Sequence, residues 1–462
     1  MSKMYDLVIL GAGGGGITAA FEAYRLGAKV ALLEKYKIGG ECTHSGCIPS
    51  KALIDVAKTY HSIDSAEKHG LHSIDVRSGF QFKRAMEHVK SIIDGVYAHE
   101  QPKRFNDLGI DTFINNTGAS FVDPHTVEIG GEKVKGKNFI IATGSGPRLL
   151  PTDPDNPVKM LNNENFWELR EQPESIAFLG GGVISAELGQ ALARFGTKVK
   201  IIDRNDRILG AIDPDVSQYL INVFADMGIE MITSANATVC SKNSDGKICI
   251  DIEQGQDNKS QLLVDELFVA IGRVPNLNGL NLEAAGIEYT RHGITVDTRM
   301  QTNVPHICAV GDVASRAKFS HVANYQAERV VRNLIHEQSN DIEITALPWA
   351  IFTDPEIGHV GVTEAQARET HQGVQTFQVD AATDRFTTDS KKGGFLKIVM
   401  DSENRILGAT GVGAHAGEWV QCLTLAVKMG LKAEDIADTV FSYPTYAEIV
   451  KKSCSRFLRT KL

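Results

Sequence analysis

The fold of this chain is specified by the stretch Tyr5-Asp-Leu-Val-Ile-Leu-Gly11-Ala-Gly13-Gly-Gly-Gly16. An apolar run with the character of a strand enters a glycine turn, a helical segment follows, and the next strand ends in the acid Glu34. Glycine lets the backbone approach a pyrophosphate, the helix N-terminus offers oriented N–H groups, and the acid accepts hydrogen bonds from a ribose. The stretch therefore predicts a dinucleotide-binding unit of strand, helix and strand.

The same pattern returns 169 positions later, in Ser175-Ile-Ala-Phe-Leu-Gly180-Gly-Gly182 and a following strand that ends in Asp203. The acid follows the first glycine by 23 residues in both copies. A single glycine pattern is weak evidence, because glycine turns also occur for purely structural reasons, but two copies in register are strong evidence. We therefore expect two bound dinucleotides, with these candidate contacts: Gly11, Gly13, Gly16, Glu34, Gly180, Gly182 and Asp203.

The rest of the chain predicts how these units are arranged. Its 462 residues suit about three domains at ~150 residues per domain. Strand-like runs flank the second unit, and the Pro- and Asp-rich stretch Pro151 to Pro157 is typical of a linker, so the second unit is inserted into the first. We predict an α/β fold of two Rossmann-like dinucleotide-binding domains and a C-terminal α+β domain, divided as 1–147 (first domain), 148–275 (second domain), 276–341 (first domain again) and 342–462 (third domain).

Composition excludes several classes of protein. The formal net charge is −9 and no Lys/Arg cluster forms a track for a phosphate backbone, so we expect no nucleic-acid partner. No stretch approaches the ~18 apolar residues of a membrane span. The apolar run Leu7–Leu10 is too short for a signal peptide. We expect a cytoplasmic protein with no membrane partner.

Two of the seven cysteines lie close together, in Gly39-Gly40-Glu-Cys42-Thr-His-Ser-Gly-Cys47-Ile-Pro-Ser-Lys51. If the segment is helical, the two cysteines lie about one turn apart on one face, and a disulfide can open and close between them. Lys51, four residues after Cys47, can favour the reactive thiolate. The segment therefore predicts a redox-active cysteine pair.

Other interpretations of the cysteines remain open. The pair could be two reduced core residues or half of a zinc site, but structural zinc sites usually show a second Cys/His knuckle, and no metal site is expected here. The redox interpretation is favoured because the pair follows a nucleotide-binding unit. His44 could take part in the chemistry, although a packing role is favoured. The separate cysteines have no ligand spacing and are expected to be core residues: Cys240, Cys249, Cys308 and Cys422.

These motifs resemble the pyridine nucleotide-disulfide oxidoreductases, which include dihydrolipoamide dehydrogenase, glutathione reductase and mercuric reductase. The resemblance extends over essentially the whole chain and rests on the cysteine segment from Gly39 to Lys51, with supporting motifs at Ala142-Thr143-Gly144, Gly272-Arg273 and Gly311-Asp312. It implies the glutathione reductase-like three-domain fold. It also implies an enzyme that binds FAD, oxidises NADH or NADPH, and forms a homodimer through its third domain.

The resemblance also assigns roles to residues. The first fingerprint would bind FAD, with Glu34 on the adenosine ribose and Asp312 on the ribityl-diphosphate, and the second would bind the nicotinamide nucleotide. Cys47 would be the thiol beside the flavin and Cys42 the thiol that attacks the substrate. Lys51 would pair with Glu187 near the flavin. The further cofactor contacts it implies are Gly40, Lys51, Thr143, Gly144, Arg204, Gly272 and Gly311.

One departure from the family pattern bears on the substrate. Where dihydrolipoamide dehydrogenase and glutathione reductase have a catalytic histidine, this chain has Tyr443, while the glutamate that orients the histidine remains as Glu448. Imidazole titrates near pH ~6.5, whereas an unperturbed tyrosine titrates near ~10 and is a poorer base. A tyrosine at position 443 resembles the pattern of mercuric reductases. Those enzymes carry a cysteine pair where this chain has the single Cys454, for which a packing role is favoured.

Four functions follow as hypotheses. The first is a mercuric reductase-like enzyme that reduces a metal ion, a small disulfide or another soft electrophile. The alternatives are a dihydrolipoamide dehydrogenase, a soluble pyridine nucleotide transhydrogenase, which Thr43-His44 resembles, and a flavin-binding sensor or interaction protein with little turnover. As donor, Asp203 favours NADH, whereas Arg204 and Arg207 would favour NADPH. We favour NADH.

Overall fold

The first sheet of the computed structural model is built around the N-terminal strand. The structure describes residues 3–71, 75, 79–150, 157–255, 258–391 and 393–461. The sheet has seven strands in the order β3-β2-β1-β6-β5-β4, with β18 beside β6. β1, β2, β3, β6 and β18 run parallel, and β5 and β4 continue antiparallel. The strands are β1 (Met4–Leu10), β2 (Val30–Glu34), β3 (Asp111–Ile114), β4 (Ala119–Asp123), β5 (Thr126–Ile129), β6 (Glu132–Ile141) and β18 (Ile307–Ala309).

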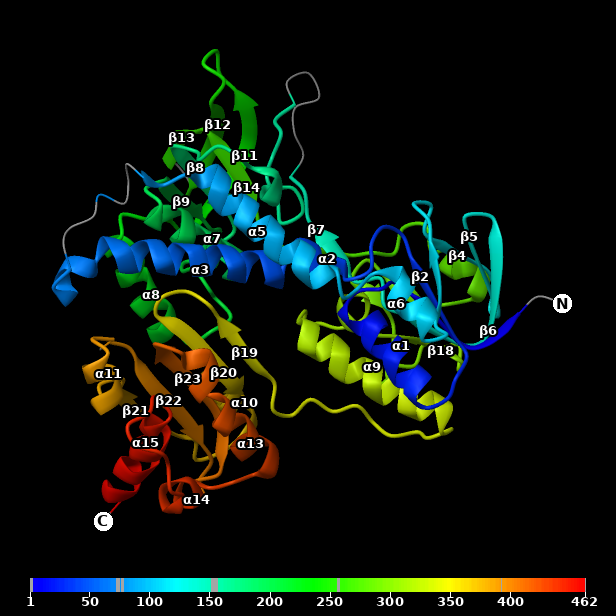
Figure 1. The fold of residues 1–462 in the computed structure, drawn as a ribbon. Helices are drawn as coiled ribbons and strands as arrows, with labels where there is room; N and C mark the ends of the chain where they lie inside the picture. Colours follow the sequence, from blue (N-terminus) through cyan, green and yellow to red (C-terminus); the bar gives the residue numbers. More distant parts are fainter. Residues whose placement is uncertain are drawn as a thin grey trace.

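Both faces of this sheet are covered. Leu7 and Ile9 point to the face where α1 (Gly14–Arg25) and α9 (Ser320–Ile335) lie side by side, at the right of Figure 1. Val8 and Leu10 point to the other face. Parallel strands buried on both faces require continuous apolar runs, which explains the sequence from Leu7 to Leu10. Strand β18 returns to this sheet after the second unit.

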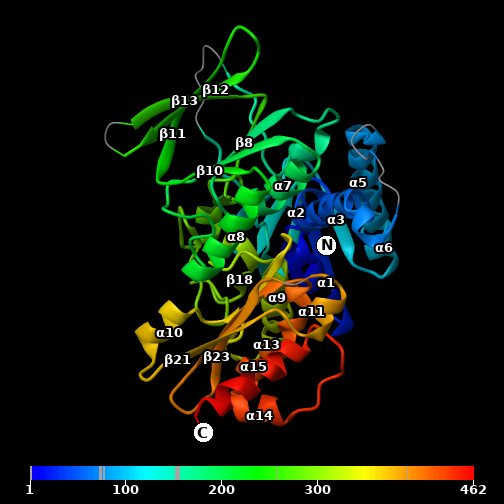
Figure 2. The same cartoon turned by 90° about the vertical axis from the view of Figure 1, so that its left-hand side faces the viewer.

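The second unit forms a parallel four-stranded sheet in the order β10-β9-β8-β14. A separate antiparallel sheet of β11, β12 and β13 projects from it, at the top of Figure 2. The elements are β8 (Ser175–Leu179), α7 (Val183–Arg194), β9 (Lys198–Ile202), α8 (Pro214–Asp226), β10 (Glu230–Ile232), β11 (Ala235–Lys242), β12 (Ile248–Gln254), β13 (Asn258–Val264) and β14 (Glu266–Val269).

An antiparallel ribbon marks the passage between the two units. It pairs β7 (Ser145–Pro147) with β15 (Arg273–Pro275). The predicted divisions at 147/148 and 275/276 fall at the ends of these strands, and we keep the four-part division as a proposal. The predicted linker from Pro151 to Pro157 lies outside the described residues, apart from its last residue.

Two long helices connect the lobe around the seven-stranded sheet (the first lobe) with the lobe around the four-stranded sheet (the second lobe). In Figure 1, α3 (Cys47–Asp64) and α5 (Phe82–Tyr97) extend from the first lobe across the second. Helix α3 buries Leu53, Ala57 and Tyr60 on one face, at the spacing of a helix that packs on one side. These side chains share one hydrophobic core with α7 of the second lobe and with Phe395 of the third. The three lobes therefore share buried apolar surface.

The third lobe is an antiparallel five-stranded sheet in the order β19-β20-β23-β22-β21. Helices α13 and α15 share a hydrophobic core with it. The first two helices after β23, α12 and α13, are separated only by Val420, whose backbone stays right-handed helical. The elements are β19 (Pro348–Ile351), β20 (Glu356–Gly361), α10 (Glu364–Thr370), β21 (Gln375–Asp380), α11 (Asp384–Thr388), β22 (Phe395–Met400), β23 (Ile406–Gly413), α12 (Ala416–Trp419), α13 (Gln421–Met429), α14 (Ala433–Asp438) and α15 (Glu448–Arg459). Within the described ranges, no helix combines the length and apolarity of a membrane span.

Candidate active site

The first glycine turn follows β1 and has no room for a side chain at Gly11 or at Gly16. Gly11 has a φ of +99°, and a Cβ there would lie 2.5 Å from the Ala142 carbonyl oxygen. A Cβ on Gly16 would lie 1.8 Å from the Gly11 carbonyl oxygen. Gly40 closes the turn from the other side, since its Cβ would lie 2.6 Å from the Gly13 Cα. The residues therefore form the bare backbone cradle that the pyrophosphate of a dinucleotide requires.

The second turn repeats this geometry at its first glycine. Gly180 has a φ of +96°, and a Cβ there would lie 2.4 Å from the Ala270 carbonyl oxygen. Gly182, like Gly13, is extended and precedes the helix. Ser185 stands where the first copy has Gly16, and its hydroxyl donates to the Gly180 carbonyl. The 169-residue register of the sequence is thus also a structural register.

The two acids lie at the same point relative to their turns. Glu34 accepts hydrogen bonds from the N–H groups of Ala12, at 2.7 Å, and Tyr36, at 2.9 Å. Asp203 accepts from the N–H groups of Gly181 and of Asn205, the latter at 2.7 Å. Each donor in the second pair stands 169 positions after its counterpart. Backbone amides therefore fix both carboxylates at the turns, while Arg204, beside Asp203, is exposed.

The other predicted cofactor contacts lie at the carboxyl ends of neighbouring parallel strands. Thr143 and Gly144 follow β6, and Gly311 and Asp312 follow β18, at the edge of the sheet where Gly11 follows β1. Gly272 follows β14 in the second sheet, beside the strand that leads into Gly180. Ligands of open parallel sheets bind at these ends.

The cysteine pair spans a break between helices. Cys42 lies in α2 (Gly40–His44), and Cys47 is the first residue of α3. The pair is therefore not on one continuous helix, because the chain turns at Ser45 and Gly46. A Cβ on Gly46 would lie 3.0 Å from the Glu41 carbonyl oxygen, so the turn is tight. Both residues are free thiols in this structure and are hydrogen-bonded to each other.

The two sulfurs of the cysteine pair differ in pKa because their surroundings differ. A hydrogen bond from Cys42 lowers the pKa of Cys47 to about 6, with help from the Ser320 hydroxyl and the Lys51 ammonium. The same bond, together with burial, raises the pKa of Cys42. Cys47 also begins α3, and Ser320, whose Oγ lies 3.7 Å from the Cys47 Sγ, begins α9. Two helix N-termini therefore add positive potential beside Cys47. At neutral pH the pair carries one negative charge, on Cys47.

The predicted ion pair of Lys51 and Glu187 is present. The Lys51 Nζ lies 2.8 Å from the Glu187 Oε2, and the other carboxylate oxygen accepts from the Phe352 N–H at 2.8 Å. The ammonium also lies 4.6 Å from the centre of the Phe352 ring. Glu187 is buried, and its carboxylate joins residues from all three lobes.

A second network of ion pairs lies beside the cysteine pair, and the sequence indicated only some of its residues. Arg273 forms an ion pair with Glu41, which directly precedes Cys42, and lies 3.4 Å from Asp312. Ser145 donates to Asp312 at 2.6 Å. Arg273 and Asp312 belong to recognised motifs, whereas Glu41 could have been found only by its position next to Cys42. Ser320 had no signal, since it lies 273 positions from Cys47.

Tyr443 and Glu448 lie in the third lobe and do not contact each other in the way the family pattern implies. The Tyr443 hydroxyl donates to Asp384 of α11 at 2.8 Å. Glu448 begins α15 and pairs with Lys452 at 2.9 Å. Within one chain, no hydrogen bond or ion pair between described residues joins Tyr443 or Glu448 to the cysteine pair.

Other candidates have packing roles. The Nε2 of His44 donates to the Ile38 carbonyl at 2.8 Å, and its ring lies edge-on to Tyr97. Cys454 is buried in the third lobe, where burial raises its pKa to about 12. Cys249 and Cys308 are buried, Cys422 is half-buried, and the side chain of Cys240 lies outside the described set. Among the side chains that the structure describes, no cluster of three or more His, Cys, Asp or Glu residues could hold a metal ion.

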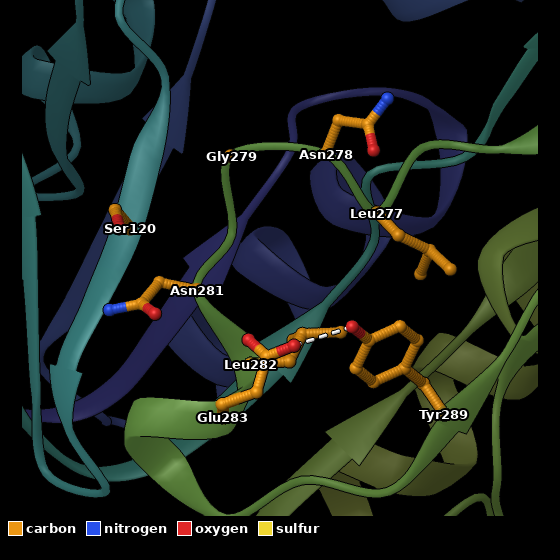
Figure 3. Close-up of a pocket in the computed structure, with 8 residues that line it drawn as sticks. All are labelled: Ser120, Leu277, Asn278, Gly279, Asn281, Leu282, Glu283 and Tyr289. Atoms are coloured by element: carbon orange, nitrogen blue, oxygen red, sulfur yellow. Dashed lines mark hydrogen bonds between the residues drawn. The ribbon is translucent and has the colours of Figure 1, made fainter.

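A cavity of about 410 Å³ lies away from this site, beside the 3₁₀ turn Leu282–Ala285 (Figure 3). It is open, and its Tyr289 hydroxyl donates to Glu283 at 2.5 Å across one end. No predicted site residue lines it. Its lining residues are Ser120, Leu277, Asn278, Gly279, Asn281, Leu282, Glu283 and Tyr289.

Comparison with known protein families shows to which family this chain belongs. A profile described as pyridine nucleotide-disulphide oxidoreductase matches residues 5–327. The chain belongs to this family. The profile of the family's dimerisation domain matches residues 347–454. The predicted fold class is confirmed, and the protein is an NAD(P)H-dependent flavoprotein disulfide oxidoreductase with FAD and NAD(P)H as cofactors.

Relatives within the family divide between two activities. The chain is 32% identical to a mercuric reductase of Staphylococcus aureus, over 98% of this chain and 82% of the relative. It is 33% identical to a dihydrolipoyl dehydrogenase of Geobacillus stearothermophilus, over 99% and 97%. Among solved structures, the HOCl-induced flavoprotein disulfide reductase RclA from Escherichia coli superposes with a TM-score of 0.85 at 26% identity, over 98% and 99%. A Cu(II) complex of RclA superposes with the same score, identity and coverage.

Proposed function

We propose that this oxidoreductase passes electrons from NADH through FAD to Cys47 and Cys42, and from there to a metal ion, a small disulfide or another soft electrophile. The observation that carries the proposal is the hydrogen bond from Tyr443 to Asp384. It raises the pKa of Tyr443 above its already high ordinary value, so the phenol holds its proton at neutral pH. A base that could deprotonate a dithiol substrate is therefore missing from the position where the family's dithiol enzymes have one.

The cofactor contacts follow from the two glycine turns. Residues of the first sheet would hold FAD, with the Gly11 turn and Gly40 around its pyrophosphate, Glu34 on the adenosine ribose, and Asp312, Thr143, Gly144 and Gly311 along the remainder. Residues of the second sheet would hold the nicotinamide dinucleotide: Gly180, Gly182, Asp203, Arg204 and Gly272. When bound, the flavin carries two electrons between the nicotinamide and the dithiol.

The thiols themselves determine what the pair can do. The Cys47 thiolate and the Cys42 thiol together release two electrons and one proton when they form a disulfide. Two Cu(II) ions, one Hg(II) ion or one small disulfide would accept these two electrons. A soft metal ion binds thiolate strongly and displaces the proton of a coordinating thiol, so it needs no separate base for Cys42. The raised pKa of Cys42 is consistent with such an acceptor.

The comparisons support this choice of acceptor. A mercuric reductase is among the relatives, and RclA has a structurally similar Cu(II) complex. The dimerisation domain supports a homodimer in which Tyr443 of one subunit faces the cysteine pair of the other. In that arrangement Tyr443 and Glu448 would complete the site that Cys42, Cys47, Lys51 and Glu187 begin.

Anaerobic titration of the holoenzyme with NADH and with NADPH, followed by the flavin spectrum, tests the electron path. A two-electron-reduced species with a long-wavelength thiolate-to-flavin band is expected, and direct bleaching of the flavin would contradict the role of Cys47. The same titration ranks the donors, with NADH expected to react more readily because amides fix the Asp203 carboxylate at the turn.

Turnover with Hg(II), Cu(II) and 5,5'-dithiobis(2-nitrobenzoate) tests the acceptor, with the Cys42→Ser variant as the control for non-enzymatic thiol oxidation. Rapid NAD-linked oxidation of dihydrolipoamide would instead favour the dihydrolipoyl dehydrogenase alternative, which has a relative at 33% identity. Hydride exchange between nucleotides that survives Cys42→Ser would favour a transhydrogenase. Bound flavin without NAD(P)H consumption under any acceptor would favour a sensor.

A further inference from the structure

Helix α11 holds the segment from Tyr443 to Tyr446 through two similar hydrogen bonds. Tyr443 donates to Asp384 at 2.8 Å, and Tyr446 donates to Asp389 at 2.6 Å. Both carboxylates belong to one short helix and its last turn, and both phenols belong to the segment that precedes α15. The position of Tyr443 is therefore set by α11, an element that lies about 60 positions earlier in the chain.

The two carboxylates of α11 have different surroundings. Asp389 also pairs with Arg385 at 2.9 Å, and the Arg385 guanidinium lies 5.7 Å from the Tyr446 ring. Tyr446 is half-buried against Phe386, with ring centres 4.8 Å apart. Tyr443, in contrast, is 68% exposed in the single chain. The Tyr446 bond is thus half-buried against the body of the lobe, while the Tyr443 bond lies at its surface.

In the family pattern, Glu448 orients the residue at position 443. In this structure Glu448 contacts other groups. Its Oε1 lies 2.9 Å from the Lys452 ammonium, one turn along α15. Its Oε2 is buried and accepts no hydrogen bond from any described residue. The charged and titratable groups that act on Tyr443 are Asp384, which is its hydrogen-bond partner, and more weakly Glu448.

We propose that Asp384, and not Glu448, is the positioning residue for Tyr443, and that the phenol serves as a hydrogen-bond donor to the bound acceptor. This inference rests on the proposed function, in which Tyr443 faces the cysteine pair of the second subunit. The phenol has one proton to donate, and Asp384 accepts it while the site is empty. An acceptor that releases an anion, such as a halide from a metal complex or a thiolate from a disulfide, offers a competing oxygen, halide or sulfur to the same proton.

The role of the phenol as a hydrogen-bond donor follows from the negative charge of Asp384. A carboxylate beside a phenol stabilises the protonated phenol, because the phenolate would place a second negative charge next to the first. Accordingly, the pKa of Tyr443 is raised chiefly by Asp384. A departing anion that competes with Asp384 can take over the proton of this phenol while Asp384 stays beside it, whereas the phenol is a poor base toward an incoming thiol.

The pairing is tested in the FAD-loaded protein by placing 3-fluorotyrosine at position 443 and following its ionisation by ¹⁹F NMR. Asp384→Asn keeps a hydrogen-bond acceptor but removes the charge, so it should lower the midpoint of the titration by about half a pH unit, the scale of an exposed charge pair. Glu448→Gln should shift the midpoint by less. Asp389→Asn is the matched control from the same helix and should leave the midpoint in place. A Glu448→Gln shift equal to or larger than that of Asp384→Asn would overturn the proposal.

Turnover provides the second readout, with NADH as donor and 5,5'-dithiobis(2-nitrobenzoate) as the disulfide probe. Asp384→Ala should lower kcat about tenfold, with a smaller change in KM, because it releases the phenol from its position. Asp384→Glu should restore most of the loss. An unchanged kcat in Asp384→Ala, or no recovery in Asp384→Glu, would overturn the donor role. If the unaltered enzyme reduces no acceptor, the proposed function fails, while the ¹⁹F titration still decides whether Asp384 holds Tyr443.

Discussion

Replacing Cys42 by alanine should raise the pKa of Cys47, whereas replacing it by serine should leave that pKa low. The largest cause of the low Cys47 pKa, about 6, is the hydrogen bond from Cys42. A serine hydroxyl can donate to the Cys47 thiolate in the same way, and an alanine methyl cannot. Both variants lack the disulfide, so Cys47 is a free thiol in each. The comparison therefore isolates the hydrogen bond.

The expected magnitude follows from the ionised fraction and from nucleophilicity. At pH 5.5 a thiol of pKa about 6 is ~24% thiolate, whereas one at the ordinary value of ~8.5 is ~0.1% thiolate. The more acidic thiolate is a weaker nucleophile, by roughly 13-fold for this difference when the Brønsted coefficient is ~0.45. The serine variant should then be alkylated about 20-fold faster at pH 5.5, while the two rates should be similar near pH ~7.5.

The assay is the rate of iodoacetamide alkylation of the holoenzyme variants between pH 5 and 9, with a Cys42→Ala, Cys47→Ser double variant as the background. A midpoint near pH 6 for Cys42→Ser and one well above 7 for Cys42→Ala are expected. Equal midpoints in the two variants would refute the assignment of the donor to Cys42. Ser320, 3.7 Å from the Cys47 sulfur, would then be the next donor to replace.

Three further results are expected. Gly16→Ala should abolish FAD retention, because its Cβ would overlap the carbonyl 1.8 Å away, whereas Ser185→Ala at the equivalent position of the second turn should retain FAD, as read from the flavin absorbance of the purified proteins. Asp203→Ala should raise KM for NADH with a smaller effect on kcat in steady-state assays, since the carboxylate is fixed where a ribose would bind. Lys397→Met should destabilise the protein by about 3 kcal/mol in urea denaturation, because it leaves Asp213 buried without its counter-charge; a loss below about 1 kcal/mol would contradict this.

The parts of the fold and site that the sequence predicted are those set by local chemistry. The glycine turns and the acids at Glu34 and Asp203 were all visible, because each depends on residues within about 25 positions. The Lys51 to Glu187 pair came from the family resemblance, and the structure confirms the contact.

The parts that the sequence did not predict depend on contacts between distant segments or on a local break. The Ser320 contact to Cys47 and the Glu41 pair with Arg273 join positions more than 200 residues apart, and no spacing rule identifies such partners. Gly46 interrupts the helix that would have joined the two cysteines, because its backbone leaves the helical region at that point.

The buried carboxylate of Glu187 also has a mechanical consequence. Its two oxygens bind the ammonium of Lys51 from the first lobe and the Phe352 N–H from the third, while its backbone belongs to the second. If one lobe moved away, the Glu187 carboxylate would lose a partner in a nonpolar environment, which costs free energy. The chain should therefore melt as a single cooperative unit in calorimetry, and truncated versions that end between the lobes should not fold as stable pieces.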